Sequence, residues 1–467
     1  MRCPTHLRAA ACALLLGSAC SVPAPSARDD GWAYRVALRD DGAALEGRLT
    51  LPAGAQQRVT VAAAATPFLD DVAALANGAA QRLPSVAGAF VVPAAAQRRD
   101  VRWRFRARDA SVAIDDIEVA ARRGGQFVGS LGAFLLQPVD GAEDLPFTLQ
   151  VDAGPLTFLC AVPTTAAGWT GRLQDLALLP PCTFGTFAHR TVTAGAAVIE
   201  VADLSPRRAA GARDLDAWVG EAAAAMRDYW GVFPVPRLLL MVTPGLRPTI
   251  TGGSARGLGG GARIFVDVPL RVRADDLRGD WVLFHEMVHL ALPSLAPQHH
   301  WLEEGSAVYL EPLLQARAGR VREHDVWQSM LEDYPQGLAA ADAGGLDDDA
   351  SWGRTYYGGA IFCLRADVEI RRLTDNRRSL RDAMRGIVAA GGNISAMWPI
   401  EDVLRTGDEA TGTTVLRDLY AAMRAAPEPR ELQSLWRELG VRLGSGHVVF
   451  DDSAPLAAVR RALVLGR

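Results

Sequence analysis

Residues 281–306 read WVLFHEMVHLALPSLAPQHHWLEEGS, and the rest of the chain is best interpreted outward from this stretch. His285 and His289 stand four positions apart, so on a helix they project from one face and both imidazoles can reach a single ion. Glu286 lies beside that face, where a carboxylate can take a proton from water without binding the ion. The pattern therefore predicts a helix that carries a catalytic metal site.

The residues around the two histidines favour a buried helix. Residues 281–284 and 290–292, on either side of the motif, are all apolar. Two histidines and a glutamate on a buried helix lose their hydration, and a bound metal compensates for that loss. The alternative, two ordinary histidines on a surface helix, would be accompanied by charged neighbours.

A third ligand is expected from the acidic pair Glu303 and Glu304, which follows the histidines after a proline-containing turn. Successive helical residues point about 100° apart, so only one of the pair can face the ion. His299 and His300 are further alternatives, as ligands or as hydrogen-bond partners of a ligand. Two histidines, one glutamate and one open position are typical of a catalytic zinc site, whereas a structural site closes all four positions.

Before this region, residues 31–200 predict a β-rich N-terminal domain. Short alternating segments separated by glycine, proline and aspartate indicate strands. No titratable side chains are grouped there at a chemical spacing, so we expect the domain to be structural or to frame the substrate. The expected strands are Tyr34–Leu38, Arg58–Ala63, Val101–Ala107, Thr148–Val151 and Thr191–Val201.

Residues 201–339 predict the domain that holds the metal-binding helix. A glycine-rich loop at Gly252–Gly261 precedes a strand rather than a helix, which excludes a phosphate-binding loop, because such a loop must open a helix. The loop instead indicates a flexible backbone beside a cleft. The expected elements are a helix at Leu215–Trp230 capped by Asp214, strands at Leu238–Val242 and Ile264–Val268, and helices at Asp275–Leu292 and Trp301–Gln315.

Residues 340–467 predict a helical C-terminal subdomain that closes one side of the site. Apolar residues recur three and four positions apart, which is typical of amphipathic helices. The expected helices cover residues 356–372, 379–390, 413–425 and 430–439.

Composition excludes several kinds of chemistry. The 467 residues contain no lysine, so a lysine Schiff base and a Walker-type phosphate site are both excluded. The net charge is −4 and the sequence has no basic stripe, which argues against a nucleic-acid partner. We expect the partner to be a peptide or protein substrate.

The N-terminus predicts export from a Gram-negative bacterium. Arg2 and Arg8 precede the apolar run 9–16, and small residues lead to Cys20, as in a secretory signal peptide over residues 1–20. Cys20 is also placed as in a lipoprotein signal, with residues 21–30 as a linker, although Gly17 stands where such signals usually have leucine. Lipidation of Cys20 would give an outer-membrane lipid anchor, and simple cleavage would give a periplasmic or secreted protein. No later stretch is long and apolar enough to span a membrane.

Two of the remaining cysteines are candidates for a disulfide bond. Cys160 and Cys182 are expected in an oxidising compartment, where such a pair can form a bridge. Cys363 lies in an apolar helical run and is expected to be a buried thiol.

The motifs together resemble the glycyl aminopeptidase family of zinc metallopeptidases, which belongs to the gluzincin clan with the alanyl aminopeptidases and thermolysin. The resemblance extends back to residues 173–187 and is strongest over residues 281–385. It rests on the motifs at 285–289 and 301–305 and on the tail residues Tyr356, Gly359, Asp367, Ile370, Arg371, Thr374, Ser379 and Leu380.

The resemblance implies a fold and two residue roles. The fold would be a multidomain α+β protein with an N-terminal β-sandwich-like domain, a thermolysin-like zinc catalytic domain and a helical subdomain. Glu304, directly before Gly305, would be the third ligand of one catalytic Zn²⁺. Tyr356 would donate a hydrogen bond to the oxyanion of the tetrahedral intermediate, with Tyr357 as the alternative.

The sequence departs from the family at two points. Gly358 stands where the family has lysine. The family also has an acidic residue in its glycine-rich segment for the substrate amine, whereas residues 252–256 read Gly-Gly-Ser-Ala-Arg. A free amino terminus would therefore lose its charged partner, while peptide hydrolysis itself is unaffected.

Three functions follow from these observations. The first is a glycyl-aminopeptidase-like zinc peptidase that acts outside the cytoplasm, with Gly252, Gly253, Arg256 and Tyr357 near the substrate. The second is an endopeptidase, or an exopeptidase that binds a carboxylate through Arg256. The third is a non-catalytic cell-envelope lipoprotein that binds partners and retains a vestigial zinc site.

Overall fold

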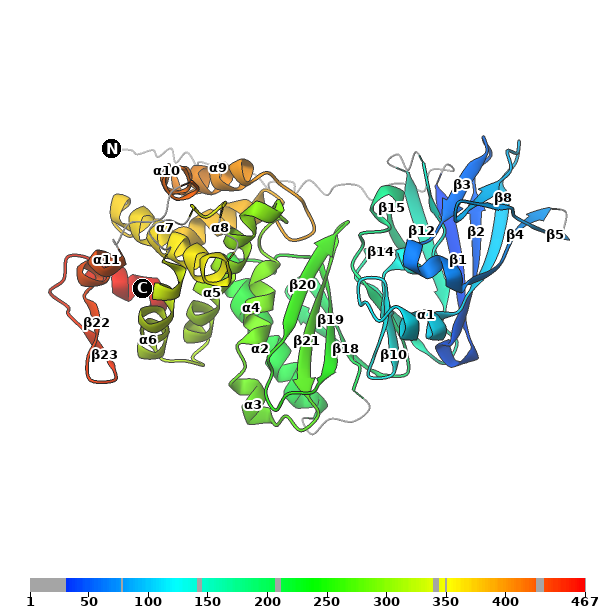
Figure 1. The fold of residues 1–467 in the computed structure, drawn as a ribbon. Coiled ribbons are helices and arrows are strands. Elements are labelled where there is room, and N and C mark those ends of the chain that lie inside the picture. The colour runs from blue at the N-terminus through cyan, green and yellow to red at the C-terminus, as the bar shows by residue number, and fades with distance from the viewer. Residues whose placement is uncertain are drawn as a thin grey trace, which may run out of the picture.

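The computed structural model describes residues 31–466 except 77–78, 141–144, 206–210, 339–343, 349–350 and 426–431. The predicted signal peptide, linker and Cys20 lie outside the described residues. Figure 1 shows the β-rich N-terminal part at one end of the molecule, a second sheet in the middle and the helical part at the other end. No helix within the described residues has both the length and the apolarity that a membrane crossing requires.

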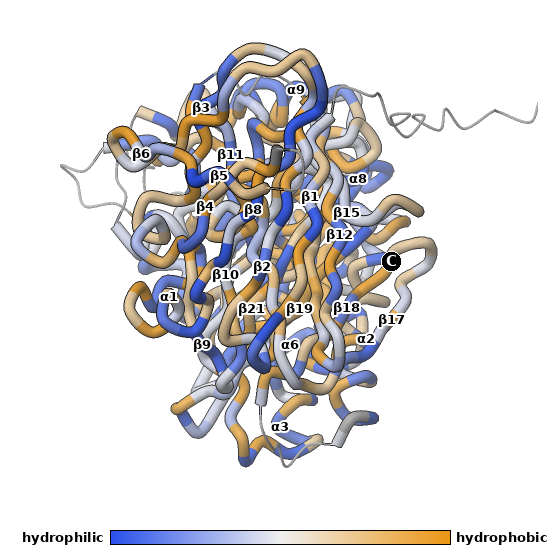
Figure 2. The backbone as a smooth tube through the Cα atoms, turned by 90° about the vertical axis from the view of Figure 1, so that its right-hand side faces the viewer, coloured by the Kyte–Doolittle hydropathy of each residue, from blue (hydrophilic) through white to orange (hydrophobic). Residues whose placement is uncertain are grey.

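The N-terminal part is built from three sheets, as the alternating segments predicted. The largest has the strand order β14-β15-β12-β1-β2-β8-β4-β5, and two four-stranded sheets have the orders β13-β16-β10-β9 and β11-β3-β7-β6. Strand β1 (Trp32–Arg39) alternates between buried and more exposed residues, and its buried face joins the core of this part. Figure 2 looks onto the large sheet and shows hydrophilic and hydrophobic residues alternating along its strands.

The bounds of the N-terminal elements agree with the predicted strands at most points. The predicted strand Val101–Ala107 ends earlier, because Ala107 begins helix α1, and the predicted strand Arg58–Ala63 is shorter. The elements are β2 (Ala44–Leu51), β3 (Gln57–Thr60), β4 (Leu69–Ala76), β5 (Ala79–Arg82), β6 (Ser85–Val86), β7 (Ala89–Val92), β8 (Arg99–Phe105), α1 (Ala107–Ala113), β9 (Ala120–Arg123), β10 (Gln126–Gly129), β11 (Gln137–Pro138), β12 (Pro146–Asp152), β13 (Thr157–Leu159), β14 (Thr164–Thr165), β15 (Gly168–Arg172) and β16 (Cys182–Gly185).

The central sheet has the order β17-β18-β19-β21-β20. Its strands are β17 (Ala188–Ala194), β18 (Ala197–Asp203), β19 (Arg237–Gly245), β20 (Gly253–Leu258) and β21 (Gly261–Pro269). The predicted single strand Thr191–Val201 is wrong: it is a hairpin that turns at Gly195, whose φ of 69° suits glycine. The predicted domain boundary after residue 200 falls inside β18.

The predicted glycine-rich loop is also wrong, because most of it forms the edge strand β20. Residues 253–258 pair antiparallel with β21 along their whole length. The glycines of this segment were interpreted as a sign of a flexible loop, but here Gly253 lets the backbone of β20 lie close to the side chain of Glu286. At Gly253 an added Cβ would lie 2.5 Å from Cγ of Glu286.

The helices of the site lie against this sheet. Helix α2 is Ala212–Trp230, and Asp214 lies inside it, where its carboxylate accepts a hydrogen bond from the Gly211 N–H. The predicted continuous helix Asp275–Leu292 is wrong, because it consists of α3 (Ala274–Arg278) and α4 (Val282–His289). Helix α5 (His300–Arg317) contains the predicted helix Trp301–Gln315.

The C-terminal part is helical, as predicted, and it shares one hydrophobic core with the central sheet, α4 and α5. The predicted helix 356–372 begins with a turn of π-helix at Arg354–Gly358. The elements of the C-terminal part are α6 (Glu323–Asp333), α7 (Gly359–Leu373), α8 (Leu380–Ala389), α9 (Ile400–Thr411), α10 (Val415–Met423), α11 (Leu432–Leu439), β22 (Val441–Leu443), β23 (Val448–Phe450) and α12 (Ala457–Leu465).

The candidate disulfide bond is absent from the structure. Cys160 and Cys182 are both buried free thiols, and Cys182 Sγ donates a hydrogen bond to the Gly129 carbonyl at 3.3 Å. Burial raises the pKa of Cys160 to about 12, so this thiol stays protonated near neutral pH. Cys363 is a buried thiol, as predicted.

Candidate metal centre and active site

Helix α4 presents its polar side chains from a buried position. His285, Glu286 and the residues between Val282 and Val288 are all buried. Asp280 lies two residues before the helix, and its carboxylate accepts hydrogen bonds from the Val282 and Leu283 N–H groups at 3.0 and 3.1 Å. The indole of Trp218 on α2 donates a third hydrogen bond to the same carboxylate at 3.0 Å. Asp280 therefore fixes where the helix starts and which way its histidines face.

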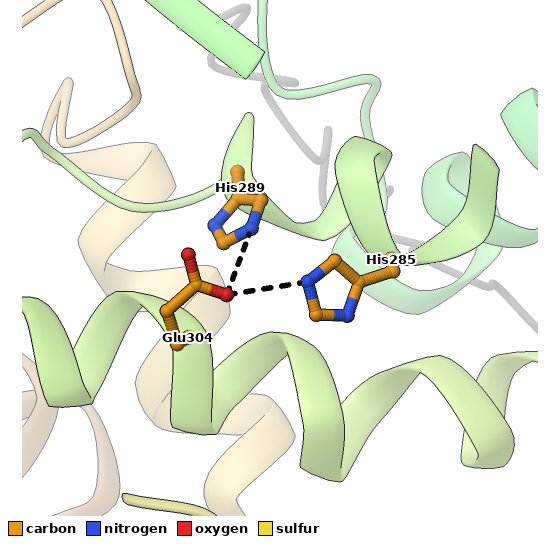
Figure 3. Close-up of side chains that lie close together, drawn as sticks. All are labelled: His285, His289 and Glu304. Atoms are coloured by element: carbon orange, nitrogen blue, oxygen red, sulfur yellow. Dashed lines mark hydrogen bonds and ion pairs between the residues drawn. The ribbon is translucent and has the colours of Figure 1, made fainter. Parts of the chain in front are cut away.

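The structure brings His285, His289 and Glu304 together (Figure 3). Glu304 Oε2 lies 3.3 Å from His285 Nε2 and 3.7 Å from His289 Nε2. Two atoms that bind one zinc ion tetrahedrally at 2.0–2.1 Å are about 3.4 Å apart, so these separations suit a shared ion. Two imidazole nitrogens and one carboxylate oxygen are also donors that zinc accepts in catalytic sites. The three residues therefore fit a zinc ion, with His285 and His289 on α4 and Glu304 on α5.

Burial and mutual charge shift the pKa values of this cluster in opposite directions. Burial lowers the pKa of His289 to about 4. Burial also acts to lower the pKa of His285, but the hydrogen bond to Glu304 and the nearby carboxylates raise it overall. Burial would raise the pKa of Glu304, yet its hydrogen bonds to His285 and His300 hold that pKa well below its usual range. Glu304 is therefore an anion and His289 a neutral imidazole at neutral pH, which are the forms that bind a metal.

Glu286 lies beside the cluster in a different environment. Burial raises the pKa of Glu286 to about 7, against the opposing charges of His285 and Arg263. Glu286 is 6% exposed, and its side chain lies against the backbone of Gly253 on β20. A carboxylate whose pKa lies near neutrality is suited to accept and return a proton.

The remaining candidates from the turn before α5 lie around Glu304 and do not complete the donor set. His300 Nε2 is 3.2 Å from Glu304 Oε1, and His300 Nδ1 is 2.8 Å from Glu303 Oε2. The other oxygen of Glu303 accepts a hydrogen bond from the Leu295 N–H at 3.1 Å. Glu303 therefore holds the turn, and His300 holds the carboxylate of Glu304. His299 points to Asp347 instead, at 3.0 Å.

Tyr356 and Tyr357 face different parts of the molecule. The Tyr356 ring lies parallel to the His285 ring, with centroids 6.5 Å apart. Burial raises the pKa of Tyr356 to about 12, with a further contribution from the nearby carboxylate of Glu304. Tyr357 packs against Tyr334, with ring centroids 6.2 Å apart. Tyr356 is thus the tyrosine whose ring lies against the cluster, and contact of Tyr357 with the substrate stays a prediction.

Strand β20 places the predicted substrate-binding residues at different distances from the cluster. Gly253 contacts Glu286, whereas Gly252 accepts a hydrogen bond from the Asp267 N–H at 2.9 Å. Arg256 is exposed, and its positive charge contributes to the lowered pKa of His289.

Arg263 was not predicted from the sequence. It lies on β21, the strand next to β20 in the central sheet. Its side chain is 1% exposed, forms an ion pair with Glu118 of the N-terminal part, and donates to the Ser254 carbonyl at 2.9 Å. Arg263 joins the N-terminal part to the wall of the site. The pairing of Arg263 with a residue 145 positions away has no local signal, so sequence alone could not identify it.

The crystal structures that are similar to this structure include three at low sequence identity. The first is an aminopeptidase N family protein from Idiomarina loihiensis, with a TM-score of 0.66, 15% identity, and coverage of 88% of this chain and 78% of that one. The second is a mutant of a two-domain M1 zinc metallopeptidase bound to L-arginine, with a TM-score of 0.51, 14% identity and coverage of 86% and 96%. This chain has the fold of the M1 zinc metallopeptidases.

The third similar structure is a mutant M1 zinc metallopeptidase from Deinococcus radiodurans bound to a Tyr-Ser-Ala substrate. Its TM-score is 0.51, with 16% identity and coverage of 86% of this chain and 94% of that one. No protein-family model matches the sequence, and no curated protein matches it. The M1 fold confirms the predicted multidomain α+β architecture.

Proposed function

We propose that this protein is a zinc-dependent peptidase in which His285, His289 and Glu304 hold one Zn²⁺. The observation that supports this most directly is the buried donor set, which fits zinc and lies beside a carboxyl group of pKa about 7 in an M1 fold. When bound, the zinc would polarise the scissile carbonyl and make water more acidic.

The residues of the chain then have distinct roles in hydrolysis. Glu286 accepts the proton of the attacking water and returns it to the leaving amine. Tyr356, whose ring lies parallel to that of His285, donates a hydrogen bond to the oxyanion as it forms. His300 keeps Glu304 oriented toward the two imidazoles.

The edge strand β20 supports an extended peptide as the substrate. Strand β20 is the last strand of the central sheet, so one side of its backbone is free to pair within the described part of the chain. A peptide that adds to this edge as a further strand passes Glu286, because Gly253 contacts that side chain.

The charges around β20 support a peptidase that does not require a free amino terminus. Ala255 stands in the glycine-rich segment where the resembling family has an acidic residue. Glu118 is paired with Arg263, and Arg256 adds a further positive charge near His289. A substrate ammonium would meet no free carboxylate on this strand. This supports an endopeptidase, or an exopeptidase that binds a carboxylate, over a glycyl-aminopeptidase-like specificity.

The test begins with the purified protein and its zinc content. We expect one zinc per chain, peptide cleavage that a chelator abolishes and zinc restores, and loss of cleavage in Glu286→Gln with zinc retained. Equal or faster cleavage of amino-terminally blocked peptides than of free ones supports the second specificity. A protein that binds zinc but cleaves nothing in a broad peptide library, with Glu286→Gln indistinguishable from wild type, would be the non-catalytic binding protein.

We also propose that the protein acts outside the cytoplasm, in the periplasm or anchored to the outer membrane through Cys20. The support is the predicted signal at residues 1–20. Mass spectrometry of the mature N-terminus decides between a lipidated Cys20 and a simple cleavage, and an intact Met1 would contradict export.

A further inference from the structure

Two exposed tryptophans stand out from the aromatic residues of this protein. The chain has 11 tryptophans, all of them among the described residues, and only Trp281 and Trp352 are exposed, at 49% and 58%. No phenylalanine or tyrosine of the described chain is exposed to this degree. An exposed indole is a large apolar surface left in contact with water, so its position calls for an explanation.

Both tryptophans contact residues of the proposed active site. The Trp281 ring meets His285 edge to face, with centroids 5.7 Å apart. The Trp352 ring stacks on Tyr356, with centroids 5.5 Å apart and 27° between the planes. Since His285 and Tyr356 are themselves parallel at 6.5 Å, the four rings form a chain of neighbouring rings, in which the two indoles are exposed and His285 is buried. We call Trp281, His285, Tyr356 and Trp352 the aromatic ledge.

The fold does not require an exposed indole at either position. The carboxylate of Asp280 accepts hydrogen bonds from the first N–H groups of α4, at Val282 and Leu283, and the side chain of Trp281 makes no capping hydrogen bond. Trp352 packs edge to face on Tyr357 at 5.3 Å with one part of its surface, yet more than half of the side chain stays exposed. Polar residues at these two positions would leave the core unchanged.

We propose that the aromatic ledge is a substrate subsite that takes an aromatic side chain next to the scissile bond. This inference rests on the proposed peptidase function. Strand β20 and the ledge both contact α4, at Glu286 and His285, so a peptide paired with β20 brings one side chain within reach of the indoles. Indole rings favour another aromatic ring over an aliphatic side chain, because ring edges and faces attract each other.

The test compares peptides that differ only in one residue beside the scissile bond. Phenylalanine and alanine are placed in turn on each side of that bond, and kcat/KM is measured for each peptide. We expect wild type to favour phenylalanine by about tenfold on one of the two sides. In Trp281→Ala and Trp352→Ala this ratio falls toward one, whereas Trp352→Phe keeps most of it.

Controls separate specificity from general damage. Leu443→Ala removes a 45% exposed leucine on β22 and is expected to keep the wild-type ratio. Zinc content and the unfolding midpoint are measured for each variant, and Trp281→Leu, which also removes the aromatic ring, replaces Trp281→Ala if the latter does not fold.

The outcomes distinguish this inference from the proposed function. Cleavage by wild type without a preference for phenylalanine on either side overturns the ledge alone. An equal fall for both peptides in Trp281→Ala and Trp352→Ala, with the ratio preserved, also overturns it. Failure of wild type to cleave any peptide refutes the proposed function and the ledge together.

Discussion

Gly253→Ala offers a direct test of Glu286 as the general base. An added Cβ would lie 2.5 Å from Cγ, 2.6 Å from Oε1 and 2.8 Å from Cδ of Glu286. Carbon atoms in contact normally lie about 3.5 Å apart, so the Glu286 side chain must move by about 1 Å. Gly253 is not among the glycines with positive φ, so the backbone itself accepts alanine.

The expected effect is a large loss of turnover with little change elsewhere. A displacement of about 1 Å in a catalytic group costs on the order of 100-fold in rate. We therefore expect kcat to fall about 100-fold. Zinc content stays at the wild-type value, because Glu286 is not among the three ligands, and the free energy of unfolding changes by less than about 1 kcal/mol.

The assay is steady-state cleavage of one fluorogenic peptide, with zinc content and urea unfolding measured on the same samples. Gly220→Ala on α2 is the matched control, because no atom lies within 4 Å of its added Cβ. That variant is expected to keep the wild-type kcat. Gly253→Ala added to Glu286→Gln is expected to cause no further loss, because both changes remove the same proton acceptor.

Two results would refute this reasoning. Wild-type turnover in Gly253→Ala would mean that the position of Glu286 does not limit the reaction. An equal loss of turnover in Gly253→Ala whether or not Glu286→Gln is present would mean that the methyl group acts on the bound peptide and not on the base.

Three further predictions concern other parts of the protein. Tyr356→Phe is expected to lower kcat by about 100-fold at unchanged zinc content, because one oxyanion donor is lost; an unchanged kcat would exclude that role. Asp367→Asn is expected to lower the free energy of unfolding by about 3 kcal/mol in urea titrations, because it leaves the buried charge of Arg371 unpaired; a change below 1 kcal/mol would contradict this. Burial raises the pKa of Glu311 to about 7, so the folded state favours the protonated carboxyl, and this contribution to stability is lost as pH rises from about 4.5 through 7. Between pH 5 and 8 the metal-free wild type is therefore expected to lose roughly 3 kcal/mol more than Glu311→Gln, and equal losses would refute the shift.

The sequence predicted the residues of the donor set because their pattern is local. His285 and His289 lie one turn apart on a helix whose apolar neighbours indicate burial, and these features survive in any context that keeps the helix. The choice between Glu303 and Glu304 came from the resemblance. The structure shows the physical difference: Glu303 holds the Leu295 N–H and His300, whereas Glu304 faces both imidazoles.

The incorrect boundaries have a common cause, which is that tertiary contacts override local preference. Residues 252–258 look like a loop by composition, yet pairing with β21 and contact with Glu286 make them a strand in which glycine is needed. The helix predicted from Asp275 breaks after Arg278, because Asp280 caps a new helix and also accepts a hydrogen bond from Trp218. Asp280 before an apolar run was a local signal of that start, whereas its contact with Trp218, 62 positions away, was not.

The question of substrate specificity depends on charge more than on fold. At 14–16% identity, this chain and the similar crystal structures share an architecture, but such a likeness does not show that they share the residues that select a substrate. Strand β20 has Arg256 and no carboxylate, and on β21 Arg263 is paired with Glu118 while Asp267 accepts a hydrogen bond from the Thr243 hydroxyl. A substrate ammonium brought to this edge would be repelled by the exposed guanidinium of Arg256. A blocked amino terminus or the interior of a peptide carries no such charge, so the same edge accepts it through backbone hydrogen bonds alone.

Replacing Ala255 by glutamate would supply the missing carboxylate, and we expect Ala255→Glu to shift the ratio of kcat/KM for free over blocked peptides upward by about tenfold. An unchanged ratio would mean that the amine is not presented to β20.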